Sequence, residues 1–195
     1  MKNKLYFSDI ITLEKELQCL VTGRIQNIYD LGNHHCYLIK INTLLPTRQT
    51  QYLIIKPGAY LYKIQDPPQD RQLIPSSFCQ KLRRHCKNKR INEISHFGND
   101  RILRIYMGDG ETEFCLVNEL FGEGNISLCD YTGKLLTFIY PHKYDGKRLH
   151  VGNQHPAWNT VKNGEWTLDT SLEKISVICQ DKIDDYAQIL SKVML

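Results

Sequence analysis

Residues 90–140 decide the fold, and they read RINEISHFGNDRILRIYMGDGETEFCLVNELFGEGNISLCDYTGKLLTFIY. Five runs rich in β-branched and aromatic residues follow one another at intervals of about ten residues. Short polar turns separate them, at Gly98-Asn99, Gly108-Asp109-Gly110, Gly122-Glu123-Gly124 and Thr132-Gly133. This regular spacing of strands and turns predicts an antiparallel sheet in a sandwich or barrel-like domain.

The region before this stretch predicts a helix and a second group of strands. Residues 8–21 repeat apolar side chains at helical spacing, with Ser8 as the N-cap and Gly23 at the C-terminal stop. Further runs predict two hairpins, over residues 24–31 with 34–41 and 52–55 with 59–64. The predicted fold class is therefore α+β, with mainly antiparallel sheets flanked by helices.

A second helix is predicted after Pro75-Ser76-Ser77. Phe78, Leu82 and Cys86 recur every fourth residue and form an apolar seam. Arg83, Lys87 and Arg90 are predicted to share another face of the same helix. The segment carries six of the 25 Lys and Arg residues, namely Lys81, Arg83, Arg84, Lys87, Lys89 and Arg90.

Such a density of cations suits the phosphate groups of nucleic acid, which are bound through salt-dependent contacts without base specificity. The alternative is an ordinary solvated helix face. The formal net charge of +4 is compatible with either interpretation.

Composition and cysteine usage indicate a globular protein of the cytosol. The chain has 195 residues, of which 42% are hydrophobic and 24% charged. Its seven cysteines lack any Cys-x-x-Cys spacing, which favours reduced thiols over a disulfide framework. Charged residues follow the first methionine closely, and no apolar run approaches the ~20 residues that span a bilayer. We expect no membrane association.

The sequence shows no motif for catalysis. It contains no His-Glu-x-x-His, no Gly-x-Gly-x-x-Gly and no phosphate-loop lysine. The histidines lack metal-ligand spacing, and Gly122-Glu123-Gly124 lies between predicted strands, as a turn does. We therefore expect no metal, no cofactor and no enzymatic activity.

Asp100-Arg101 is a second candidate for nucleic-acid contact. A guanidinium group can bind phosphate or a base edge through two hydrogen bonds, and a carboxylate can accept a hydrogen bond from an exocyclic amine. Because a carboxylate repels phosphate, the pair favours reading of a base edge. The alternative is a turn aspartate followed by an arginine at the end of a strand.

Taken in order, several segments resemble the opening domain of the NFACT family of ribosome quality-control factors. The resemblance covers roughly residues 5–156. It is carried by Phe7-Ser8-Asp9-Ile10, Asn27-Ile28-Tyr29-Asp30-Leu31, Pro75-Ser76-Ser77-Phe78, Lys81-Leu82-Arg83-Arg84-His85, Asp100-Arg101, Glu119-Leu120-Phe121 and Gly124-Asn125-Ile126.

The resemblance implies a role in ribosome quality control. A domain of this kind would bind a stalled large ribosomal subunit that carries peptidyl-tRNA, and would help recruit tRNA for untemplated elongation of a C-terminal tail. The implied tRNA-binding residues are Asp9, Asp100, Arg101, Glu119 and Leu120. Recruitment of a ubiquitin ligase of the listerin type is expected only with domains outside this chain.

The resemblance also bears on organisation and on alternative functions. Residues 1–160 are expected to form the family's N-terminal domain, and 161–195 a linker and a helix that begins a truncated or missing middle region. The implied fold is similar to the N-terminal domain of formamidopyrimidine-type DNA glycosylases. Glycosylase chemistry needs an N-terminal proline followed by glutamate, whereas this chain begins Met1-Lys2-Asn3. The third function considered is a protein-binding module of the fibronectin-binding type.

Overall fold

The computed structural model describes residues 5–32, 35–44, 48–144, 146–156 and 158. The chain divides into two compact units, residues 1–159 and 160–195, and every described residue belongs to the first. Cys179 and the linker and helix predicted over residues 161–195 lie outside the described residues.

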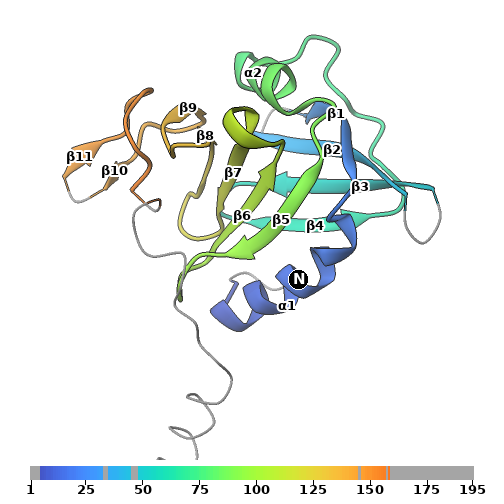
Figure 1. Cartoon of the computed structure of the whole chain (residues 1–195), viewed down its shortest axis with the longest axis horizontal. Coiled ribbons are helices and arrows are strands. Elements are labelled where there is room, and N and C mark those ends of the chain that lie inside the picture. Colours follow the sequence, from blue (N-terminus) through green and yellow to red (C-terminus); the bar gives the residue numbers. More distant parts are fainter. Residues whose placement is uncertain (1–4, 33–34, 45–47, 145, 157, 159–195) are drawn as a thin grey trace, which may run out of the picture. The chain divides into compact units, whose positions relative to one another are not determined.

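The first sheet is a four-stranded antiparallel meander with the order β1-β2-β3-β4 (Figure 1). Its strands are β1 (Arg24–Leu31), β2 (Cys36–Thr43), β3 (Gln49–Lys56) and β4 (Tyr60–Ile64). This arrangement confirms both predicted hairpins, because β1 pairs with β2 and β3 pairs with β4.

The second sheet is a five-stranded antiparallel meander with the order β5-β6-β7-β8-β9. Its strands are β5 (Ile91–His96), β6 (Ile102–Met107), β7 (Phe114–Glu119), β8 (Asn125–Asp130) and β9 (Leu135–Phe138), with a 3-10 turn, η2 (Gly110–Thr112), before β7. Every residue of β6 is buried, so this sheet is covered on both faces. A short antiparallel hairpin of β10 (Lys143–Tyr144) and β11 (Lys147–Arg148) follows in the chain.

The first helix, α1 (Phe7–Leu17), continues into a 3-10 turn, η1 (Gln18–Leu20). The N-cap is Tyr6 rather than the predicted Ser8, and the Tyr6 backbone N–H donates to the Asp9 carboxylate over 2.8 Å. The left-handed residue after the helix is Thr22, with φ of 72°, and not Gly23. Gly23 is needed for space, since a Cβ there would lie 2.8 Å from Cγ2 of Ile41.

The second helix, α2 (Ser77–Cys86), begins at Ser76, whose hydroxyl accepts from the Cys79 backbone N–H over 3.2 Å. Phe78, Leu82 and Cys86 are buried, as the apolar seam predicts. The predicted helical face that included Lys87 and Arg90 is wrong. Lys87 has an extended backbone, and Asn88 turns the chain in a left-handed conformation.

The two sheets enclose one core and join along their edges. At one junction the Ile25 N–H donates to the Lys89 carbonyl over 2.9 Å, and at another the Gly58 N–H donates to the Glu119 carbonyl over 3.0 Å. Both helices contribute buried side chains to the core between the sheets. α1 contacts β4, β5 and β6, whereas α2 contacts β1 and β9. The helices therefore lie at opposite ends of the sheets (Figure 1).

Candidate functional site

The turn between β5 and β6 presents Asp100 and Arg101. Asp100 is exposed, and its carboxylate accepts from the Arg101 backbone N–H over 2.7 Å. Arg101 is half-buried. Its guanidinium lies 5.6 Å from the centre of the Phe121 ring and donates to the Leu5 carbonyl over 3.3 Å. The two side chains thus differ in their surroundings, because the Arg101 guanidinium contacts Leu5 and Phe121 whereas the Asp100 side chain is exposed to solvent.

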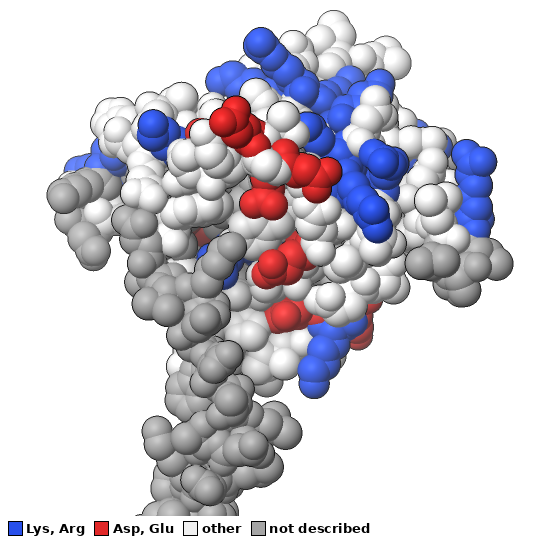
Figure 2. Space-filling view, in the orientation of Figure 1, with Lys and Arg blue, Asp and Glu red and all other residues white. Residues whose placement is uncertain are grey.

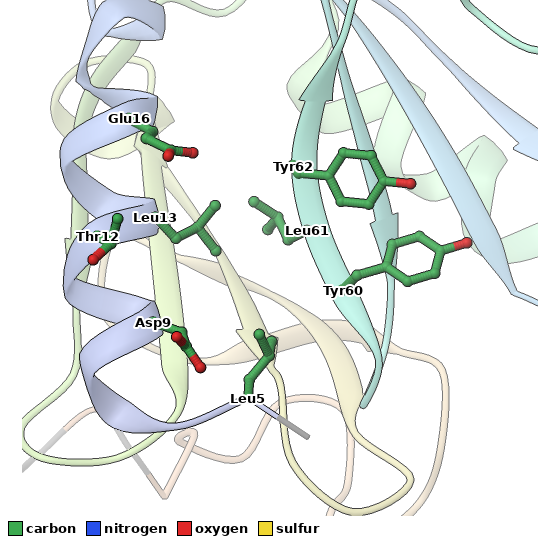
Figure 3. A pocket seen from close by; sticks show the side chains of 8 residues that line it. All are labelled: Leu5, Asp9, Thr12, Leu13, Glu16, Tyr60, Leu61 and Tyr62. Carbon is green, nitrogen blue, oxygen red and sulfur yellow. The ribbon is translucent and has the colours of Figure 1, made fainter. Parts of the chain in front are cut away.

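Asp9 lines a groove of about 290 Å³ between α1 and β4. Figure 3 shows Asp9, Leu13 and Glu16 of α1 opposite Leu61 of β4, with Leu5 at the lower end. The groove therefore has an apolar floor and two carboxylates on its helical side. Leu5 belongs to this groove and also accepts the hydrogen bond from Arg101, so the groove and the β5–β6 turn are adjacent.

Glu119 is the last residue of β7 and Leu120 follows it, but each is only 2% exposed. The Leu120 N–H donates to the Arg101 carbonyl over 2.8 Å, which fixes the backbone behind the arginine. In this arrangement neither side chain offers surface for direct contact with tRNA. Their predicted role in tRNA binding stays a prediction, and the geometry suits positioning of Arg101.

Buried polar groups surround Glu119 on the outer face of the second sheet. The Tyr144 hydroxyl donates to the Glu119 carboxylate. Burial raises the pKa of Glu119, with a further increase from the nearby Asp100, while the Tyr144 hydrogen bond and His142 oppose the shift. The Glu119 side chain is also part of a cavity of about 280 Å³ that includes Phe121 and His142.

His155 lies in the same buried cluster, with its Nε2 atom 3.8 Å from Oε1 of Glu119. Burial lowers the pKa of His155 to about 4, and the neighbouring Arg104 contributes in the same direction. At neutral pH the imidazole is therefore uncharged, so the contact with Glu119 is not an ion pair. Tyr144, Leu149 and Trp158 pack with apolar residues on the same face of the second sheet.

The tertiary structure thus gathers Asp9, Asp100 and Arg101 at the α1 end of the domain. Sequence reasoning missed Leu5 and Phe121, the two residues that hold the Arg101 guanidinium. Phe121 falls within the quoted Glu119-Leu120-Phe121 segment, but nothing in the sequence indicates that its ring lies against an arginine about twenty positions earlier.

The basic segment lies apart from this site, at the α2 end. Lys81, Arg84, Lys87 and Arg90 are exposed, whereas Lys89 is half-buried. Arg83 is also half-buried, and its Nε donates to the Ile28 carbonyl. Figure 2 shows Lys and Arg side chains gathered over the α2 end, with Asp and Glu side chains running down the middle of the same face. Asp9, Asp100 and Arg101 therefore lie on a different surface from the basic segment that is predicted to bind phosphate groups.

Within the described residues, no cluster of three or more His, Cys, Asp or Glu side chains could hold a metal ion. The six described cysteines are free. No helix in the described part of the chain has the length and apolar character needed to cross a membrane.

Comparison with known proteins identifies relatives across most of the chain. Residues 8–192 match the family described as NFACT N-terminal and middle domains. The chain is 33% identical over 151 residues to "Ribosome quality control complex subunit NEMF homolog" of Drosophila melanogaster, covering 76% of this chain and 15% of that protein. It is 32% identical over 174 residues to "Ribosome quality control complex subunit 2" of Schizosaccharomyces pombe, covering 84% of this chain and 16% of that protein.

Solved structures agree with the α+β fold. The N-terminal domain of fibronectin-binding protein PavA from Streptococcus pneumoniae superposes with a TM-score of 0.67 at 23% identity, covering 80% of this chain and 65% of that one. The fibrinogen-binding protein from Staphylococcus aureus gives a TM-score of 0.61 at 21% identity, covering 79% of this chain and 55% of that one.

The family match runs past residue 156, the limit of the resemblance drawn from sequence segments. The chain spans only about 15% of the Drosophila relative and 16% of the yeast relative. The chain belongs to the NFACT family of ribosome quality-control factors, and its described fold is that of the family's N-terminal domain.

Proposed function

We propose that this domain acts in ribosome quality control in the cytoplasm, as an RNA-recognition domain rather than an enzyme. It would bind a stalled large ribosomal subunit with its peptidyl-tRNA and help recruit tRNA for untemplated elongation of a C-terminal tail. Relatives named as ribosome quality control complex subunits support this role. The observation that carries the tRNA contact is the exposed Asp100 in the same turn as Arg101, whose guanidinium is held by Leu5 and Phe121.

The geometry supports recognition of a base edge at this end of the domain. Arg101 is braced from behind, so its binding to RNA needs little side-chain ordering. Asp100 can accept a hydrogen bond from an exocyclic amine, a group that phosphate lacks. Asp9 faces the adjacent groove and supplies a second acceptor. In this proposal the protein contributes positioning of tRNA, while ribosomal RNA forms the peptide bond.

The α2 end supplies the second surface. Lys81 and Arg84 are exposed on a helix whose apolar face is buried, and the exposed Lys87 directly follows the end of that helix. Long cationic side chains on a fixed helix suit contacts with the RNA backbone, which give affinity without sequence preference. We assign this surface to phosphate groups of ribosomal RNA. The separation of the two surfaces would let the domain contact the subunit and a tRNA at the same time.

A second candidate function is protein binding, because the superposing structures are named as fibronectin-binding and fibrinogen-binding proteins. That function does not require the Asp100 and Arg101 side chains. The likeness to glycosylase domains stays a prediction of fold only.

The test is equilibrium binding of labelled tRNA to the full chain across a salt series. The Asp100→Ala, Arg101→Ala double variant is compared with wild type. The control is Asp109→Ala, Lys134→Ala, which removes one exposed residue of each charge elsewhere. We expect the double variant to lose about 1–3 kcal/mol of binding free energy, and the control to bind as wild type does. Equal binding by all three proteins would refute base recognition at this site.

A further inference from the structure

The outer face of the first sheet carries tyrosines in a regular arrangement. Cross-strand pairing aligns the outward residues of the four strands in rows. The first row contains Asn27, Lys40, Tyr52 and Ile64. The second row contains Tyr29, Leu38, Ile54 and Tyr62. A third row brings Leu31 beside Cys36 and Lys56 beside Tyr60, with the Tyr60 hydroxyl 3.8 Å from the Cys36 sulfur. An antiparallel sheet with one face on the core usually presents polar residues on the other, so this face departs from the common pattern.

The tyrosines form the upper layer of this face, above a packed aliphatic floor. Leu38 is fully buried and Ile54 is 7% exposed, whereas Tyr62 is 39% exposed. Tyr29, Tyr52 and Tyr60 are half-buried against the same floor. The floor holds the rings in place, which lowers the conformational entropy lost when a ligand stacks on them.

Both described helices place their buried side chains in the core between the sheets, and α2 reaches this face at its β1 edge, where the Arg83 guanidinium lies 5.6 Å from the centre of the Tyr29 ring. Figure 3 shows the Tyr60 and Tyr62 rings pointing away from α1, to the far side of β4. Both residues also line the groove that contains Asp9, so the tyrosine face begins where the groove ends.

The charged side chains within the strand rows of this face are cations, whereas the exposed Asp70 lies at its edge, where the Asp70 carbonyl accepts from the Gly32 N–H. Lys40 and Lys56 stand within the rows, and the Arg71 guanidinium lies 4.5 Å from the centre of the Tyr29 ring. The four strands contain one acidic residue, Asp30. It is buried, and its carboxylate accepts from the Ser76 backbone N–H over 2.7 Å and the Ser76 hydroxyl over 3.0 Å. The face therefore combines rings and cations with no acidic side chain of its strands directed to solvent.

We propose that the outer face of the β1–β4 sheet binds a segment of unpaired RNA. Aromatic rings on a four-stranded sheet stack bases whatever their identity, and neighbouring cations bind the intervening phosphates. A proline-rich peptide also suits an aromatic surface, but it would leave Lys40, Lys56 and Arg71 without partners of opposite charge. The inference deepens the proposed function and rests on it, because RNA with unpaired loops is the ligand that the domain would meet.

The experiment measures binding of a labelled oligouridine of about twelve nucleotides to the full chain by fluorescence anisotropy. Tyr52→Leu, Tyr62→Leu removes two rings while keeping the face apolar, and Tyr52→Phe, Tyr62→Phe restores the rings without the hydroxyls. We expect the leucine variant to bind at least about tenfold more weakly, and the phenylalanine variant to bind nearly as wild type does. Lys40→Gln, Lys56→Gln should lower the salt slope by about 1.4.

Far-ultraviolet circular dichroism of each variant checks that the sheets are intact. The Asp100→Ala, Arg101→Ala variant separates this inference from the proposed function, because it should weaken tRNA binding and leave oligouridine binding unchanged. If the leucine variant binds oligouridine as wild type does, the tyrosine face is not a site for unpaired RNA. Binding of a proline-rich peptide in place of oligouridine would also overturn the proposal that this face binds unpaired RNA.

Discussion

Thr22 and Gly23 show how a single residue can have a different role from the one that its type indicates. A glycine after a helix predicts the left-handed position, yet Thr22 takes that conformation and Gly23 makes room for Ile41. The Thr22 N–H donates to the Ile91 carbonyl over 2.8 Å, and the Ile91 N–H to the Gly23 carbonyl over 2.8 Å. These pairings between the two sheets fix the local backbone and offset the strain at threonine.

His155 gives a prediction at the residue scale. Its pKa falls from 6.5 to about 4 on folding, so between these values the unfolded chain binds a proton that the folded chain does not. The free energy of unfolding therefore keeps its full value with respect to His155 above pH 6.5, and it decreases as the pH falls towards 4. Glu119 has the opposite effect on the pH dependence of stability. Because its pKa is raised in the folded state, the stabilisation from its protonated carboxyl is lost as the pH rises.

We expect His155→Gln to lose less stability than wild type on acidification, by about 2–3 kcal/mol between neutral pH and roughly pH 4.5. Urea unfolding at the two pH values measures the difference. His150→Gln is the matched control, because the His150 side chain is exposed. If both variants follow the wild-type dependence on pH, the His155 imidazole does not titrate as the burial indicates.

At the scale of an element, α2 separates an apolar face from a cationic one within ten residues. The helix ends at Cys86 because Lys87 is extended and Asn88 is left-handed, which lets residues 88 and 89 pair with Ile25. Long-range pairing to β1 therefore overrides the helical pattern of the basic segment. As a result the exposed cations extend beyond the helix instead of forming one face of it.

The cations of this element should control the salt dependence of RNA binding. Replacing Lys81, Arg84 and Lys87 with glutamine should reduce the slope of log K against log salt for duplex RNA by roughly 2–3, because each phosphate contact releases counterions. Titrations at several salt concentrations measure this slope. A control with Lys15, Lys134 and Arg148 replaced by glutamine removes the same charge from other exposed positions. An equal reduction of the salt slope in both variants would mean that RNA binding depends on the net charge of the protein and not on the position of these cations.

At the scale of the whole domain, a contact between two glycines joins the sheets. Gly58 lies in the β3–β4 turn and Gly124 in the β7–β8 turn, and both have positive φ. A Cβ on Gly124 would lie 1.8 Å from the Gly58 nitrogen, and the Gly58 N–H donates to the Glu119 carbonyl over 3.0 Å. This junction also carries Glu119 and Phe121, so the site and the closure of the fold depend on the same turn.

We expect Gly124→Ala to destabilise the domain by about 3 kcal/mol or more, because the added methyl meets backbone that cannot move without separating the sheets. Thermal or urea unfolding measures the loss. Gly122→Ala in the same turn is the control: its φ is also positive, but a Cβ there meets nothing within 4 Å. It should cost only the backbone strain of about 1–3 kcal/mol. Equal losses would show that strain, and not the approach of the two turns, limits this position.

The sequence by itself determined the element pattern, the turns and the family. Strand periodicity, turn glycines and the cap at Ser76 are local signals, because each arises from interactions within a few residues. They predicted both hairpins, the five strands after residue 90 and the buried seam of α2. Asp100 and Arg101 were also identified from sequence, as a motif in its family context.

Only the tertiary structure decided which of these residues and elements contact one another. The burial of Glu119 and Leu120, the Leu5 and Phe121 contacts of Arg101 and the placement of the basic segment at the opposite end all depend on how the two sheets close. The same holds for the tyrosine rows, which require the register of four strands. Contacts between residues far apart in sequence are set by packing of the shared core, and local propensity carries no information about them.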